Sequence, residues 1–246
     1  MLPGLNTPGY LGLISGSMFS GKTSKLIELY KQYTLCDIPV VVINHAADDR
    51  YSKVDMSTHD GHVIPCIRTE QLTDLKIDPA ITEARVILIN EGQFFNDIVG
   101  WVRTQVDVKG KIVFVCGLDG DYNRQRFGSW LDLIPLSDEI VKLTSLCMVC
   151  KRRAGIFSHR LSSNTDQILI GNDQYIPVCR GCYKNTSTKD TRECLGASIV
   201  DKREKLAALQ RACLELPRTK RSSIKLKCNH LDEQITRECI EYMKKH

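Results

Sequence analysis

The chain has 246 residues, 42% hydrophobic and 26% charged, a composition that excludes disordered and fibrous proteins and allows one large core with a small second module. No apolar run approaches the ~20 residues of a membrane span, and the start, MLPGLNTPGYLG, lacks the pattern of a secretory signal, so we expect a cytoplasmic protein that meets no membrane. Residues 1–183 hold 19 basic and 20 acidic side chains, whereas residues 184–246 hold 15 and 9, which argues against nucleic acid as a partner of the main domain.

Short runs of β-branched apolar residues predict an α/β domain at residues 9–145. These runs are continuous rather than alternating, which is typical of strands buried on both faces of a parallel sheet. We expect strands at Tyr10–Ser15, Val40–Asn44, Val86–Asn90, Ile112–Leu118 and Glu139–Thr144. Crossover helices fit between them, and the clearest is Lys22–Leu35. Its apolar face holds Leu26, Leu29, Tyr30 and Tyr33.

A loop after the first strand matches the phosphate-binding pattern G-x-x-x-x-G-K-[ST] in full. It consists of Gly16, Ser17, Met18, Phe19, Ser20, Gly21, Lys22 and Thr23. The glycines let backbone N–H groups converge on phosphates, and the N-terminus of the following helix adds about half a positive charge. Lys22 would reach the β- and γ-phosphate oxygens, and the Thr23 hydroxyl would bind Mg²⁺. We therefore expect a nucleoside triphosphate on a P-loop NTPase-like parallel sheet flanked by helices.

The loop alone does not separate kinases from GTPases, motors and helicases. The chain has no N-K-x-D guanine motif, and motors and helicases usually need more residues. The strand in VILINEGQFF ends beside Glu91, where a carboxylate could take a proton from a small-molecule hydroxyl, and the two phenylalanines could contact a flat base. A solvated strand-end carboxylate is the alternative for this stretch.

Two C-x-x-C pairs, Cys147 with Cys150 and Cys179 with Cys182, supply four thiolates, the number that a closed structural zinc site needs. The 28 residues between the pairs exceed a zinc-ribbon gap, so we expect the metal to close the base of a long loop that folds over a substrate. An iron–sulfur or redox role is the alternative. A catalytic zinc is not expected, since no ligand position is left open.

The C-terminal residues 194–246 predict two amphipathic helices separated by the basic stretch RTKRSSIKLK. We expect a basic helical tail and assign it no role.

Taken together and in this order, the motifs closely resemble the type II thymidine kinases, a family of cytosolic cellular, bacterial and large-DNA-virus enzymes. The resemblance covers residues 9–183 and rests on SGSMFSGKT, DDRYS with STHD, NEGQFF, LDGDYNRQRFG, KLTSLCMVC and QYIPVCRGCY. It implies an ATP-dependent thymidine kinase, which transfers the γ-phosphoryl group of ATP to the 5′-hydroxyl of thymidine and also of deoxyuridine. It further implies a small zinc-binding lasso domain at 146–193 that closes over the nucleoside, a homotetramer, and feedback inhibition by thymidine triphosphate.

Carried over by position, the resemblance makes Glu91 the general base and places Asn90 and Gln93 beside the ATP phosphates. The residues that it places around thymidine are Met18, Phe94, Leu118, Tyr122, Phe127 and Tyr175. Arg50 and Arg160 match arginines near the family's site, without an assigned role.

Two positions depart from the family pattern. Asn90 stands where aspartate is usual, so we expect an active enzyme in which Mg²⁺ binding depends less on protein ligands. We also expect Glu91 to ionise more easily, because it has no negatively charged neighbour at position 90. Ser17 stands where proline is common, which a loop backbone should tolerate.

Two other functions remain open at this point. A nucleotide sensor without catalysis is suggested by Asn90, but a sensor has no use for the base Glu91. A zinc-ribbon ATPase that binds nucleic acid would need basic residues around the knuckles. Those present are Lys151, Arg152, Arg153 and Arg180.

Overall fold

The structure is a computed structural model that describes residues 3–5, 7–47, 55–57, 63–162, 165–168 and 174–185, with only the backbone described at 55–57 and 63. The expectations for Arg50, for the motif DDRYS, for most of STHD and for the helices of 194–246 lie outside these residues. Among the helices that are described, none combines the length and apolarity needed to cross a bilayer.

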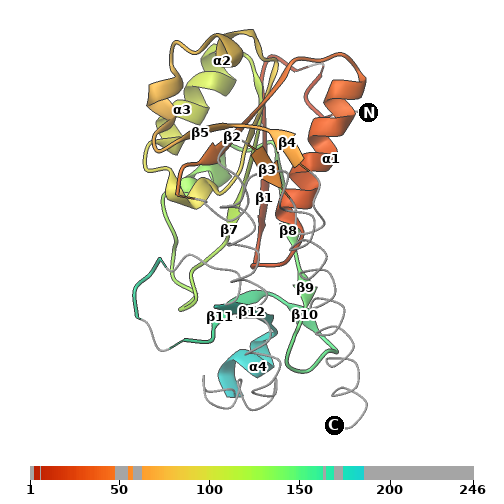
Figure 1. The fold of residues 1–246 in the computed structure, drawn as a ribbon, viewed down its shortest axis with the longest axis vertical. Helices are drawn as coiled ribbons and strands as arrows, with labels where there is room; N and C mark the ends of the chain where they lie inside the picture. Colours follow the sequence, from red (N-terminus) through yellow and green to blue (C-terminus); the bar gives the residue numbers. More distant parts are fainter. Residues whose placement is uncertain are drawn as a thin grey trace, which may run out of the picture.

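A central sheet of six parallel strands runs in the order β5-β2-β6-β7-β1-β8 (Figure 1). The strands are β1 (Tyr10–Gly16), β2 (Val40–His45), β5 (Ile67–Thr69), β6 (Val86–Ile89), β7 (Ile112–Leu118) and β8 (Glu139–Leu143). The predicted α/β class is confirmed, and the five predicted strands agree with these bounds to within one residue. The edge strand β5 was not predicted, because three residues with Arg68 at their centre show no buried-strand pattern.

Helices cover both faces of this sheet. Helix α1 (Lys22–Leu35) lies on one face, with α2 (Pro79–Glu83) and α3 (Ile98–Arg103) on the other (Figure 1). Further non-α helical segments complete the second layer: η1 (Leu72–Leu75), η2 (Gly92–Phe94), η3 (Thr104–Val108) and η4 (Trp130–Leu136). Helix α1 has the predicted bounds and buries Leu26, Leu29 and Tyr33, while Tyr30 is partly buried.

Alternate residues of each strand enter two separate cores, which explains the continuous apolar runs in the sequence. Leu88 and Phe114 pack toward α1, whereas their neighbours Ile89 and Val115 pack toward the opposite layer. Helical layers therefore bury both faces of the central strands, and polar residues that could form a site lie at the ends of these strands.

A smaller unit follows the sheet and lies beneath it in Figure 1. It contains the antiparallel pairs β9 (Ser145–Leu146) with β10 (Ala154–Gly155) and β11 (Phe157–Arg160) with β12 (Tyr175–Val178), then α4 (Arg180–Asn185). In the sheet domain, β3 (Asp55–Ser57) pairs antiparallel with β4 (Val63–Pro65). The segment between the cysteine pairs thus includes an antiparallel strand pair, β11 with β12, and we call residues 145–185 the cysteine unit. The predicted domain bounds themselves stay a prediction.

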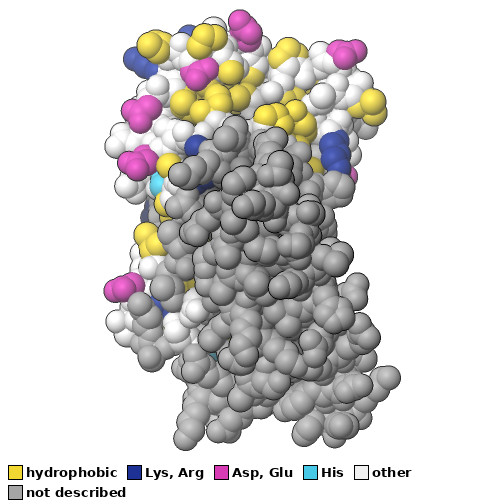
Figure 2. Space-filling view, in the orientation of Figure 1, with side chains coloured by type: hydrophobic (Ala, Val, Ile, Leu, Met, Phe, Trp, Pro, Cys, Tyr) yellow, Lys and Arg dark blue, Asp and Glu magenta, His cyan; other side chains and the backbone are white. Residues whose placement is uncertain are grey.

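On the face drawn in Figure 2, acidic and basic side chains of the described residues are interspersed with apolar ones. Neither charge sign covers a continuous area over the part of the sheet domain seen there.

Candidate active site

The phosphate loop lies where β1 ends and α1 begins. Gly21 has φ 85°, a left-handed conformation that costs glycine little, and it places the loop directly over the start of the helix. The Lys22 side chain is buried, and its Nζ donates to the Ser17 carbonyl 2.8 Å away, so the amine lies across the loop. Thr23 is half-buried in the first helical turn. Backbone N–H groups, an amine and a hydroxyl are thus gathered at one end of the sheet.

The cysteine unit contacts this loop directly. The Ser17 hydroxyl donates to the Gly155 carbonyl at 2.9 Å, and the Met18 backbone N–H donates to the Ser158 hydroxyl at 2.9 Å. Both contacts join residues more than 130 positions apart in the sequence. The hydroxyl of Ser17, where proline is common in the resembling family, therefore takes part in holding the two parts together.

Asn90, at the end of β6, belongs to a buried polar group that spans three strands. Its Nδ2 donates to Asn44 Oδ1 at 3.0 Å, and its Oδ1 accepts from the Cys116 thiol at 3.0 Å. Neither partner was predicted, although the change from apolar to polar at the end of the run VVVINH is a signal that could have pointed to Asn44. The Asn90 amide is engaged within the sheet on both sides.

Glu91 follows at the same edge, buried and in a left-handed conformation with φ 55°. Gln93 Nε2 donates to Glu91 Oε2 at 2.5 Å. Because β1, β6 and β7 are parallel, the phosphate loop, Glu91 and Leu118 all lie at the carboxyl edge of the sheet, where ligands bind in open α/β folds.

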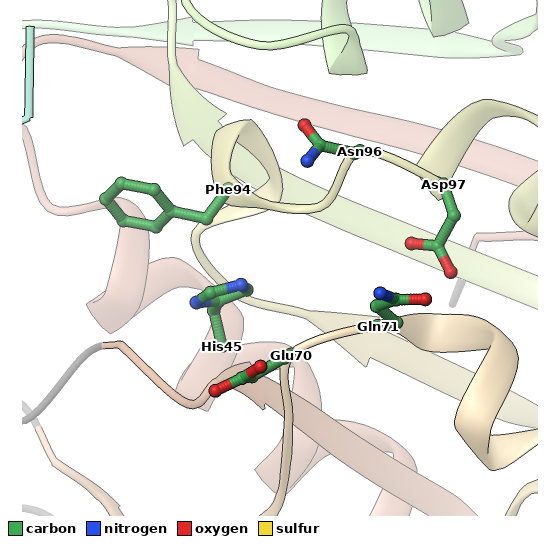
Figure 3. A pocket seen from close by; sticks show the side chains of 6 residues that line it. All are labelled: His45, Glu70, Gln71, Phe94, Asn96 and Asp97. Carbon is green, nitrogen blue, oxygen red and sulfur yellow. The ribbon is translucent and has the colours of Figure 1, made fainter.

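Aromatic side chains border this edge. The Phe94 and Phe127 rings meet edge to face with centroids 5.5 Å apart, and His45 packs against Phe94 at 5.4 Å. Phe94 also lines an open cavity of about 470 Å³ (Figure 3). The other lining residues are His45, Glu70, Gln71, Asn96 and Asp97. Sequence reasoning placed Phe94 and Phe127 beside a base but missed this polar cavity next to Phe94.

Arg160 connects the two predicted pocket tyrosines. Its guanidinium carbon lies 3.8 Å from the centroid of the Tyr122 ring, and its Nη2 donates to the Tyr175 hydroxyl at 2.5 Å. It also donates to the Asp166 and Gln167 carbonyls, the latter at 3.1 Å. Only 3% of Arg160 is exposed. A buried cation thus organises the residues that the sequence assigned to the nucleoside.

Further hydrogen bonds tie the cysteine unit to residues 118–128. The Tyr122 hydroxyl donates to the Thr165 carbonyl at 2.9 Å, and Gln167 Nε2 donates to Asp121 Oδ2 at 2.9 Å. The Tyr183 hydroxyl donates to the Tyr122 carbonyl at 2.7 Å. The cysteine unit therefore holds both the side-chain hydroxyl and the backbone carbonyl of Tyr122.

The four cysteines lie together, with their Sγ atoms all within 4.8 Å of one another, although the two pairs are far apart in the sequence. Backbone N–H groups favour thiolate here: a hydrogen bond from the Arg152 amide lowers the pKa of Cys150 to about 6, and one from Cys182 lowers the pKa of Cys179. Burial raises the pKa of Cys182, a penalty that a bound cation would offset. Four clustered thiols of this kind can hold a zinc ion.

All of the predicted site residues lie within the described part of the chain except Arg50. The structure brings the phosphate loop, Glu91 and the aromatic residues to one edge of the sheet, and brings Tyr175 to Tyr122 through Arg160. It shows Gln93 bonded to Glu91 and Leu118, so its predicted contact with phosphate stays a prediction.

Comparison with known proteins gives one consistent result. A family model described as thymidine kinase matches residues 9–183. The thymidine kinase of monkeypox virus is 43% identical over 176 residues, which cover 71% of this chain and 97% of that protein. The raccoon poxvirus thymidine kinase is 42% identical over 178 residues, 72% of this chain and 98% of that protein. The variola virus thymidine kinase is 43% identical over 176 residues, with 71% and 97% covered. The family match ends at Tyr183, before the C-terminal tail.

Proposed function

Because the chain belongs to the thymidine kinase family, we propose that it transfers the γ-phosphoryl group of ATP to the 5′-hydroxyl of thymidine, and also of deoxyuridine. The observation that carries this proposal is the position of Glu91: a buried carboxylate at the same edge of the sheet as a complete phosphate loop. A protein that only binds nucleotides has no use for such a base.

In the proposed reaction, Glu91 takes the proton from the 5′-hydroxyl as the oxygen attacks the γ-phosphorus. The bond from the γ-phosphorus to the β–γ bridging oxygen breaks, and ADP leaves with its electron pair. Glu91 then releases the proton to solvent. The products are thymidine monophosphate, ADP and one proton.

The chain's own groups support the positioning that this step requires. The loop amides, Lys22 and the start of α1 would hold the β- and γ-phosphates and offset their charge. The Thr23 hydroxyl is an oxygen donor suited to Mg²⁺, which when bound neutralises charge on the same phosphate oxygens. Asn90 Oδ1 already accepts from Cys116, which supports the expectation that the protein contributes little to holding the metal at this position.

On the nucleoside side, we propose that the base lies among Met18, Phe94, Leu118, Tyr122, Phe127 and Tyr175, and that Zn²⁺ on the four cysteines holds the cysteine unit in place. A zinc ion held by all four cysteines would supply structural support alone, since these thiolates would fill a closed tetrahedral site. A homotetramer, feedback inhibition by thymidine triphosphate and a cytoplasmic location stay predictions.

The test incubates the purified protein with ATP·Mg²⁺ and an equimolar mixture of thymidine, deoxyuridine, deoxycytidine, deoxyadenosine and deoxyguanosine, and identifies the products by mass. We expect thymidine and deoxyuridine monophosphates, and neither of them with Glu91→Gln. Purine or cytidine monophosphates would contradict the proposed specificity. No phosphorylation, with thymidine triphosphate still bound tightly, would favour the nucleotide-sensor function that Asn90 suggested.

A further inference from the structure

The Gln93 side chain joins the carboxylate of Glu91 to the backbone at the end of β7. Its Nε2 donates to Glu91 Oε2 at 2.5 Å, and its Oε1 accepts from the Leu118 N–H at 3.0 Å. These partners fix the orientation of the amide, because only the NH₂ end can donate to a carboxylate and only the oxygen can accept from an N–H group. Gln93 is 2% exposed, so water does not compete for either bond.

The surroundings allow the Gln93 side chain little other room. A Cβ atom on Gly117 would lie 2.8 Å from Gln93 Oε1 and 2.8 Å from the Trp130 ring, and one on Gly128 would lie 2.2 Å from the Gln93 carbonyl oxygen. The Trp130 indole N–H in turn donates to the Leu118 carbonyl at 2.9 Å. Close packing at Gly117 and the buried indole therefore hold the side-chain amide of Gln93, and the close approach of Gly128 holds its main chain.

A donor at this position has a chemical consequence for the carboxylate. Hydrogen bonds to the charged form favour ionisation, and bonds to a charged acceptor are stronger than neutral ones. The bond from Gln93 Nε2 to Oε2 uses one of the roughly four acceptor positions of the Glu91 carboxylate and orients the group. The amide would keep Glu91 both ionised and fixed while a hydroxyl approaches.

We propose that Gln93 is a positioning residue for Glu91, acting through the carboxylate rather than on the ATP phosphates. This inference rests on the proposed function, because it assumes that Glu91 is the base. It replaces the sequence-based expectation that Gln93 contacts phosphate with a role in the alignment and ionisation of that base.

The test uses two substitutions of similar length. Gln93→Met removes the donor and the acceptor, whereas Gln93→Glu keeps an acceptor for Leu118 and puts a second carboxylate against Glu91. Gln105→Met, another buried glutamine in η3, is the matched control, and Glu91→Gln reports on the base itself. For each variant, kcat and both KM values are measured across pH 5.5–9, together with the melting temperature.

We expect Gln93→Met to lower kcat about 10- to 100-fold, the size of a lost hydrogen bond to a charged group, with the KM for ATP within about twofold. Without the donor, Glu91 keeps its proton to higher pH. The acid limb of the kcat profile, the pH range in which kcat falls as the base is protonated, therefore moves to higher pH. Gln93→Glu should move it further, because two adjacent carboxylates share a proton. Gln105→Met should leave kcat and the acid limb unchanged.

Four results would overturn the inference. A tenfold rise in the KM for ATP with an unmoved acid limb would make Gln93 a phosphate ligand. A lower melting temperature and lower kcat with an unmoved acid limb in both variants would leave it a structural residue. Full turnover by Glu91→Gln would show that Glu91 is not the base, and the proposed function and this inference would then fail together. An inactive Glu91→Gln variant, with Gln93 variants that behave like the unaltered protein, would reject the inference alone.

Discussion

The phosphate loop and the cysteine unit meet at one edge of the sheet, but they are shaped in different ways. The loop depends on its own backbone, with Gly21 in a left-handed conformation between a buried strand and a helix. The cysteine unit depends on side chains that reach across the chain, such as Arg160 to Tyr122 and Tyr183 to Tyr122. The first arrangement is local and the second is long-range.

This difference divides the expected effects of mutation. Apart from Met18, which we place beside the base, changes in the phosphate loop should act on ATP and on the chemical step, whereas changes in the cysteine unit should act on the nucleoside. The contacts of Ser17 and Met18 with Gly155 and Ser158 are the points where the division could fail, because they join the two regions.

The largest effect should come from the loop. Lys22→Met removes the amine that lies across residues 17–22, and loss of such a charged donor in a kinase site should lower kcat/KM about 1,000-fold. Lys31→Met, an exposed position on the same helix, is the control and should change little. Steady-state kinetics with thymidine in excess measure both. A loss below tenfold would mean that the loop does not hold the transferred phosphate.

The next largest effect should come from the metal. Cys179→Ser removes one of four clustered thiols, so we expect zinc content to fall from one ion per chain to none and the KM for thymidine to rise about 100-fold. Metal analysis and kinetics of the same preparation give both values, with the exposed Cys36→Ser as control. An unchanged KM in a zinc-free protein would show that the cysteine unit does not shape the nucleoside site.

Arg160→Met tests whether the cysteine unit acts on the nucleoside alone. It leaves the Tyr175 hydroxyl and two carbonyls without their donor, so we expect the KM for thymidine to rise about 10- to 50-fold with the KM for ATP unchanged. Arg160→Lys should recover only part of the loss, since an ammonium cannot stack and fork as a guanidinium does. Arg103→Met, an exposed position on α3, is the control. Equal rises in both KM values would speak against the division.

Asn90→Asp tests a smaller effect on the phosphate side. A carboxylate there should lower the Mg²⁺ concentration needed for half-maximal rate about 3- to 10-fold and raise turnover, while its charge moves the acid limb of kcat to higher pH. Titration of Mg²⁺ at fixed ATP measures the first effect. If the Mg²⁺ requirement does not fall and turnover does not rise, the role of Asn90 is limited to its hydrogen bonds with Asn44 and Cys116.

The smallest effect should come from the junction itself. Ser17→Ala removes one neutral hydrogen bond to Gly155, worth about 1 kcal/mol, so we expect a rise of about two- to fivefold in the KM for thymidine. Ser24→Ala, an exposed serine on α1, is the control. A much larger loss that includes ATP would show that the two regions act as one unit.

The same division explains what the sequence could predict. The loop, α1, the five longer strands and the four cysteines follow from local patterns and spacing, and the strand end in VILINEGQFF pointed to Glu91, which the family resemblance then made the general base. The links from Gln93 to Leu118, from Asn90 to Asn44 and from Arg160 to Tyr122 join residues 25 or more positions apart, and no periodicity encodes them. They depend on which strands are neighbours, as does the cavity beside Phe94, whereas β5 was missed because its three residues show no buried-strand pattern.

The most direct test of this account measures equilibrium binding of ATP·Mg²⁺ and of thymidine, each alone, by calorimetry on the unaltered protein, Lys22→Met and Arg160→Met. We expect Lys22→Met to weaken ATP binding and leave thymidine binding unchanged, and Arg160→Met to weaken thymidine binding and leave ATP binding unchanged. If either substitution weakens both ligands equally, phosphate and nucleoside are not held by separate regions and the account is contradicted.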